Sequence, residues 1–88
     1  MGDAAAAIGR HEAARSRYEK ALDFSTKMQN RPELALCHLG LAEVILDHYP
    51  EERDAAIEHL DFAIAELRDM KMQPALERAL GRRELLEA

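Results

Sequence analysis

Positions 42 residues apart carry matching residue types along much of this chain of 88 residues. The matched pairs are Ala13 and Ala55, Ala14 and Ala56, Ala21 and Ala63, Met28 and Met70, Pro32 and Pro74, and Leu34 and Leu76 (56 − 14 = 42, for instance). Chance could align alanines in an Ala-rich chain, but it would not easily align both prolines with breaks in the helical pattern. Self-similarity at a fixed period is typical of repeat architectures. The sequence therefore predicts repeated helix pairs, each of which needs a stacked neighbour to bury both of its faces.

The segments between the breaks have helical periodicity. Apolar residues recur at spacings of three and four over residues 10–29, 33–46, 51–70 and 74–86, and the strong helix formers Ala, Leu, Glu and Arg dominate them. An alanine run at residues 1–8 predicts one or two further helical turns, ended by Gly9. Pro32, Pro50 and Pro74 separate the long helices, because the residue before a proline avoids the α region. We expect an all-α fold of antiparallel helix-turn-helix repeats, with four long helices plus a short N-terminal helical piece.

Eighty-eight residues allow one small domain. Its expected parts are a partial repeat at residues 1–31, a complete repeat at residues 32–73 and a terminal capping helix at residues 74–88. Small residues let helix backbones approach each other, and Gly40 is the main example, because a helical glycine costs about 1 kcal/mol that close packing would offset. The residues expected to pack the repeats together are Ala14, Tyr18, Ala21, Leu36, Leu39, Gly40, Ala56, Leu60 and Ala63.

This pattern resembles the tetratricopeptide repeat (TPR) family. Its first helix has a large apolar residue followed by Leu-Gly, and its second helix has a small residue, a bulky residue and Ala. The residues that carry the resemblance are Leu36, Leu39 and Gly40, then Ala56, Leu60 and Ala63, and, in the partial repeat, Gly9, Ala14, Tyr18, Ala21 and Leu22. Two residues depart from the pattern: Glu43 stands where the family often has Tyr, and the proline near the repeat end is displaced to Pro74. The period of 42 residues also exceeds the family's usual length of about 34. Such long repeats are similar to the helical arms of large bacterial regulators of the LuxR and MalT type.

The resemblance implies a role in protein binding. In TPR arrays the first helix lines a concave groove, and its outward positions meet peptide ligands. Matched onto this sequence, those positions are Leu34, Cys37, Leu41, Val44 and Ile45. An exposed apolar stripe of this kind usually marks an interface. These residues therefore either form an interaction groove or are covered by the N-terminal segment and the last helix, and the sequence does not decide between the two.

Composition argues against several other functions. The net charge of −5 disfavours nucleic-acid binding, which needs a basic surface. No apolar run approaches the roughly 20 residues of a membrane-spanning helix, so we expect no membrane contact. A single cysteine without a signal peptide fits a reducing, cytoplasmic location.

No set of residues predicts catalysis, a metal site or a bound cofactor. The histidines are His11, His38, His48 and His59, which form neither an HExxH motif nor an i,i+4 pair. Adjacent helical residues diverge, so Cys37 and His38 should not act as nucleophile and base, and Cys37 is interpreted as a packing residue. Arg78, Arg82 and Arg83 could form a basic patch, but acidic residues interleave with them, which favours a solvated helix end.

We therefore expect a non-enzymatic protein–protein interaction and assembly module, part of a larger regulator or scaffold, with a protein or peptide partner. Because this sequence lacks the first helix of the partial repeat, we expect self-association, as a homodimer, that covers residues 10–28 or the groove. Residues 1–31 hold six basic and four acidic side chains (+2) and residues 32–73 hold three and ten (−7), which could orient head-to-tail contacts between copies. The alternative is a small-molecule effector-sensing domain of a transcriptional regulator, in which Leu41, Val44 and Ile45 help to enclose an apolar ligand.

Overall fold

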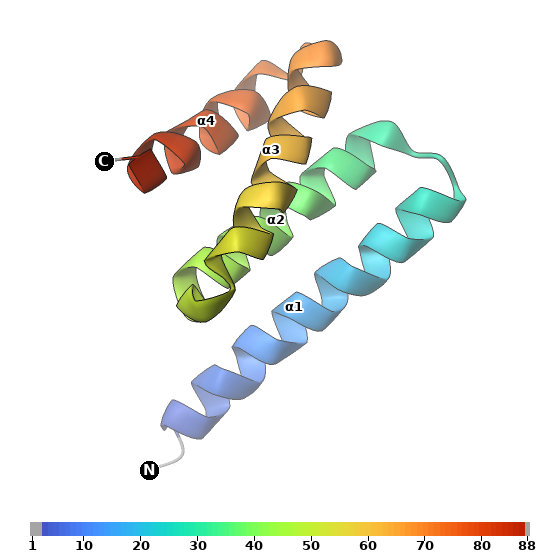
Figure 1. The fold of residues 1–88 in the computed structure, drawn as a ribbon. Coiled ribbons are helices and arrows are strands. Elements are labelled where there is room, and N and C mark those ends of the chain that lie inside the picture. The colour runs from blue at the N-terminus through green and yellow to red at the C-terminus, as the bar shows by residue number, and fades with distance from the viewer. Residues whose placement is uncertain (1–2, 88) are drawn as a thin grey trace.

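The chain forms four α-helices in a computed structural model that describes residues 3–87, with side chains described from residue 9 to residue 86. The helices are α1 (Asp3–Lys27), α2 (Arg31–His48), α3 (Arg53–Asp69) and α4 (Gln73–Glu87), and a short 3₁₀ helix, η1 (Pro50–Glu52), joins α2 to α3 (Figure 1). Residues 3–87 contain no β-strand. The predicted all-α class is confirmed.

The separate N-terminal helical piece predicted for residues 1–8 is wrong where the structure describes it, from residue 3 onward. Helix α1 runs without a break through Gly9, and residues 1–2 lie outside the described part. A glycine inside a helix costs only about 1 kcal/mol relative to alanine, and good helix formers flank it on both sides. Gly9 does not have the positive φ that a helix-ending glycine adopts, so nothing at this position ends the helix.

The turns that end α1 and α3 have the same hydrogen bonds at positions 42 residues apart. The amide of Asn30 donates to the carbonyl oxygen of Ser25 over 3.0 Å, and that of Met72 donates to Leu67 over 3.0 Å. Gln29 and Lys71, which are also 42 residues apart (71 − 29), both adopt the left-handed conformation, with φ of 54° and 58°. This is the geometry of a Schellman helix end. The local structure therefore follows the repeat that the sequence predicted for these two turns.

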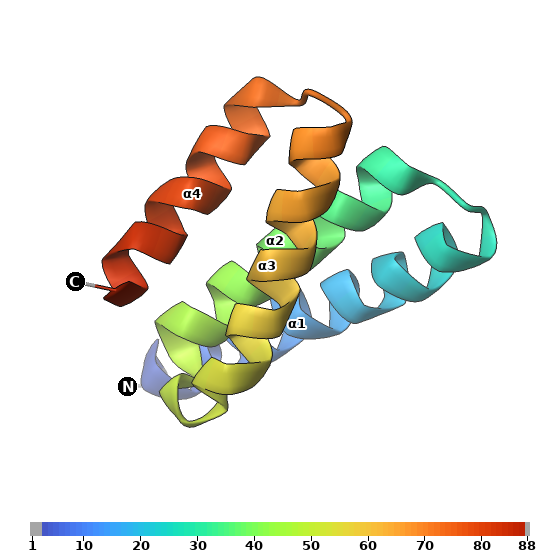
Figure 2. The same cartoon turned by 45° about the horizontal axis from the view of Figure 1, so that its top comes forward.

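Helix α2 occupies the centre of the array. It packs against α1, α3 and α4, whereas within the described residues the backbone of α1 approaches no helix other than α2. Helix α4 lies beside α3, and α1 and α4 lie at opposite edges of the array (Figures 1 and 2). The array measures 21 Å along its shortest axis, which is room for two helix layers, since one helix with its side chains is about 10–12 Å across.

Two clusters of buried side chains hold this arrangement together. The larger joins α2, α3 and α4 and consists of Ala35, Leu39, Ala42, Leu60, Ala63, Ile64, Leu67, Leu76 and Ala79. The smaller joins α2 to α3 through Leu41, Ile45 and Ala56, with Tyr18 of α1 packed against it. Of the predicted packing residues, Leu39, Gly40, Ala56, Leu60 and Ala63 are buried, and Ala14, Tyr18, Ala21 and Leu36 are half-buried.

Gly40 lets α1 approach α2 closely, as the sequence predicted. The ring of Tyr18 covers Gly40, and a Cβ atom built at that glycine would lie 2.3 Å from Cε1 of the ring. Any side chain at position 40 would therefore displace Tyr18. The helix propensity that the glycine gives up is offset by this contact between two helices.

Candidate interaction surface

Most of the predicted groove lies inside the chain. Cys37, Leu41 and Ile45 are buried, and Leu34 and Val44 are half-buried. Leu41 and Ile45 belong to the smaller core cluster, where Tyr18 of α1 packs against them. Of the two interpretations that the sequence left open, internal cover therefore applies to Cys37, Leu41 and Ile45, and they do not form an open binding stripe. The predicted dependence on the N-terminal segment is explained, because α1 supplies the cover.

Cys37 lies on the α1 side of α2 and is not a reactive thiol. Burial raises the pKa of its thiol, the nearby charge of Glu33 raises it further, and a hydrogen bond with Ser25 of α1 has the opposite effect. A raised pKa keeps the sulfur in its neutral form, which is a poor nucleophile. His38, the next residue, faces α3 instead, so the two side chains diverge as predicted.

The sequence gave no indication that His38 and His59 would meet. Their Nδ1 atoms are 2.8 Å apart across the α2–α3 contact, so one ring donates a hydrogen bond and the other accepts it. The ring of Phe62 packs on His38 with the centroids 4.1 Å apart. Burial lowers the pKa of His38 to about 4, and the charge of His59 lowers it further; burial also lowers the pKa of His59. The pair is neutral at pH 7 and joins the two helices.

The other two histidines also meet, at the far end of the α1–α2 contact. The rings of His11 and His48 stack with their centroids 3.4 Å apart. Neither pair has a third ligand nearby: among the described residues no group of three or more His, Cys, Asp or Glu side chains could hold a metal ion. No helix in that part of the chain is long and apolar enough to cross a membrane.

The arginines of α4 form ion pairs rather than a solvated helix end. Arg78 and Arg82 both bind the carboxylate of Glu43 on α2, and Arg82 also binds Asp47, with Nη1 2.8 Å from Oδ1. Arg83 binds Asp61 of α3 over 3.0 Å. The expectation of a solvated end was wrong because acidic side chains of α2 and α3 lie opposite these arginines. Glu43, the residue that departs from the TPR pattern, is thus the anchor of α4.

A second ionic contact fixes α1 to the bend after α2. The guanidinium of Arg15 binds both carboxylate oxygens of Glu52, with nitrogen–oxygen distances of 2.6 and 2.7 Å, and lies 4.8 Å above the ring of Tyr49. Bidentate pairs of this kind are stronger and more directional than single ones. The hydrogen bond from Arg15 lowers the pKa of Glu52. This contact sets the orientation of α1 about its own axis.

One cavity of about 200 Å³ opens between the end of α2, the bend and the end of α4. Its walls are Leu46, Asp47, Pro50, Arg53, Arg82, Leu85 and Leu86. None of the residues proposed to enclose an effector (Leu41, Val44 and Ile45) lines it. The enclosed ligand site that the alternative function requires is therefore not at those residues.

The side of α1 that faces away from α2 and α3 carries the largest exposed apolar side chains of that helix. Phe24 is 65% exposed and Met28 is 63% exposed. The predicted inward stripe included Met28, and the sequence analysis gave Phe24 no role. Spacing is the signal that finds this surface, because Arg10, Arg17 and Phe24 recur every seven residues, about two helical turns. We define the α1 outer face as Arg10, Ala13, Arg17, Lys20, Phe24 and Met28, all of which are exposed.

No family model, no curated protein and no solved structure matches this chain.

Proposed function

We propose that this chain is a non-enzymatic protein-interaction module that assembles with copies of itself through the α1 outer face. The observation that carries the proposal is the exposure of Phe24 and Met28 beside each other, one helical turn apart, on a face that no other described helix covers. Large apolar side chains grouped on a surface mark an interaction site more often than singly scattered ones. Burying them against a partner removes apolar surface from water.

The total surface supports the same function. The chain exposes 5873 Å², whereas a compact monomer of this mass would expose about 5,200 Å². The excess arises because α1 packs on only one helix. A partner on the α1 outer face would bring this value down and give α1 a second neighbour.

Sedimentation velocity and light scattering from low to high micromolar concentration test the proposal. The wild-type chain should assemble across this range, and Phe24→Ser with Met28→Ser should weaken assembly by about tenfold or more, since each lost apolar contact is worth on the order of 1 kcal/mol. Both side chains are exposed, so helix content and thermal stability of the monomer should not fall. Glu12→Ser, on the opposite side of α1, is the matched control. A wild-type chain that stays monomeric at high micromolar concentration would refute the proposal.

A further inference from the structure

We infer that the α1 outer face of one copy binds α4 of a second copy, in the same way that α3 binds α2 within one chain. This inference rests on the proposed function and adds the partner, the surface on that partner and the register. It is carried by a correspondence between contacts made inside the chain and faces left exposed at its two edges. The two faces also have opposite charge.

The α1 outer face corresponds to the side of α3 that packs on α2. On α3 that side includes His59, which contacts His38, and Glu66, which binds Arg31 over 2.6 Å. Subtracting 42 from each position places Arg17 and Phe24 at the equivalent positions of α1. The other equivalent pairs are Ala55 and Ala13, Ala56 and Ala14, Ala63 and Ala21, and Met70 and Met28. The same side of the repeated helix is therefore covered by α2 in α3 and left without a helix in α1.

A matching face exists on α4. The α2 residues that bind α3, Arg31 and His38, correspond to Gln73 and Leu80 of α4 when 42 is added. Helical spacing places these two on one side of α4 with the exposed residues Glu77, Gly81 and Glu84. We define the α4 outer face as these five residues.

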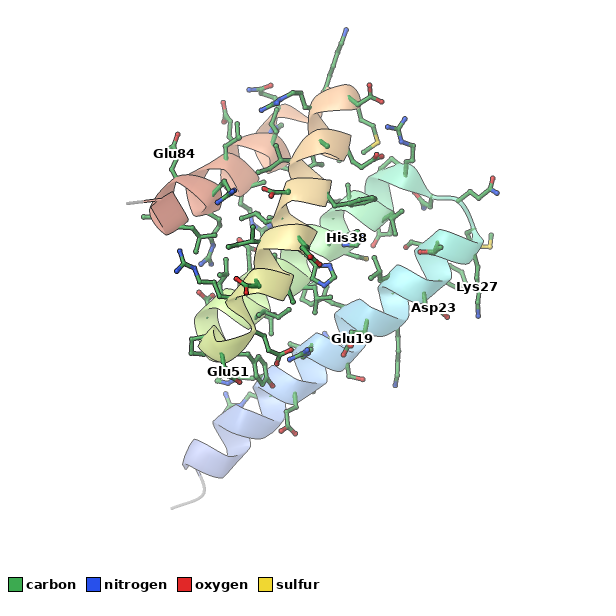
Figure 3. The ribbon with its side chains drawn as sticks, in the orientation of Figure 1. Glu19, Asp23, Lys27, His38, Glu51 and Glu84 are labelled. Atoms are coloured by element: carbon green, nitrogen blue, oxygen red, sulfur yellow. The ribbon has the colours of Figure 1, made fainter. Side chains whose placement is uncertain are left out.

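The α4 outer face is open to a partner. Glu84 projects from α4 into solvent in Figure 3, and within the described residues neither Glu77 nor Glu84 has a cationic partner. A Cβ atom built at Gly81 would meet nothing within 4 Å. A helical glycine with no packed neighbour leaves room for the close approach of another helix.

The two outer faces have complementary charge. The α1 outer face has three cations, Arg10, Arg17 and Lys20, and no acid, and none of the three cations has an ion pair within the described residues. The α4 outer face has two acids, Glu77 and Glu84, and no cation. Pairing two α1 outer faces would set cations against cations, whereas pairing α1 with α4 sets them against acids, which favours and orients the contact.

The register follows from the contacts inside the chain. If α4 takes the place of α2, and α1 of a second copy takes the place of α3, Arg17 stands where His59 stands and Leu80 where His38 stands. Arg17 then lies opposite Leu80, with Glu77 and Glu84 one turn to either side, because residues three and four apart are neighbours on a helix. Phe24 stands opposite Gln73, the equivalent of Arg31.

The contact is head-to-tail. Because α1 and α4 lie at opposite edges of the array (Figure 2), one contact leaves a free α1 face at one end and a free α4 face at the other. Such heterologous contacts build open chains or larger rings instead of closing at two copies.

Charge reversal on each face tests the inference. Arg17→Glu alone, and Glu77→Lys with Glu84→Lys alone, should each weaken assembly at least tenfold, because like charges brought together in an interface are repulsive. Mixing the two variants should restore assembly, since each variant then meets a complementary face on the other. Glu51→Lys with Glu58→Lys, on η1 and α3, makes the same charge change away from both outer faces and should leave assembly unchanged. Circular dichroism of each variant checks that the fold is kept.

The outcomes separate this inference from the proposed function. If the serine variants of Phe24 and Met28 block assembly but the α4 reversals do not, the α1 face binds another surface and the inference is wrong while the function stands. If the mixture fails to assemble although each variant is folded, the inference is also overturned. A wild-type chain that never assembles removes both.

Discussion

Helices α1 and α3 occupy equivalent positions of the 42-residue repeat and differ in what covers them. Leu60 of α3 is 0% exposed, because α2 and α4 both pack around α3. Its equivalent in α1, Tyr18, is half-buried and packs on α2. Glu66 of α3 binds Arg31 of α2, whereas its equivalent Phe24 is exposed. The comparison shows that the repeat pattern determines where helices begin and end, while burial is set by the helices that pack alongside.

The largest expected effect breaks this comparison at its most buried position. Leu60→Ala should lower the free energy of unfolding by about 3 kcal/mol, the loss typical of a fully buried leucine. Tyr18→Ala should cost about half as much, because part of its ring already contacts water. Urea denaturation followed by circular dichroism measures both. Equal losses at the two positions would mean that α1 is covered as completely as α3.

The sequence predicted the fold class and the turns because both depend on local chemistry. Helix formers, prolines and the 42-residue period are visible without knowing what packs where. It did not predict that Cys37 and Ile45 are covered, because cover depends on how α1 is oriented, and the Arg15–Glu52 contact that orients α1 joins residues far apart in the chain. Phe24 was missed for a related reason: an apolar residue outside the inward stripe becomes meaningful only once its face is known to be open.

An effect of intermediate size comes from the histidines, which titrate only on the α3 side of the comparison. His38 has a folded-state pKa of about 4, below its ordinary value, so the unfolded chain binds protons more readily than the folded chain. The stability is therefore fully present above pH 6.5 and is lost as the pH falls through 4. We expect the free energy of unfolding to fall by about 2 kcal/mol between pH 7 and pH 4, less than the full linkage value because the rings keep some hydration.

The control for this loss is a variant that cannot titrate at the pair. His38→Gln with His59→Gln should remove most of the pH dependence, although Glu58, Glu19 and Arg15 also act on the pKa of His59. His48→Gln, at the exposed stacked pair, should leave the pH dependence as it is. If the wild-type pH profile persisted in the double variant, other groups would be responsible for the acid sensitivity.

The smallest expected effect tests where the two halves are alike. Gln29 and Lys71 hold positive φ with the same hydrogen bonds around them, and a residue with a Cβ atom is strained in that conformation. Gln29→Gly and Lys71→Gly should therefore each raise the free energy of unfolding by about 1 kcal/mol. Lys71→Ala should give no gain, because alanine keeps the Cβ atom. The two glycine variants should agree with each other although the Tyr18 and Leu60 variants do not, because strain at a turn is local and burial is not. A gain at Lys71 without one at Gln29 would show that α1 unfolds separately from the other three helices.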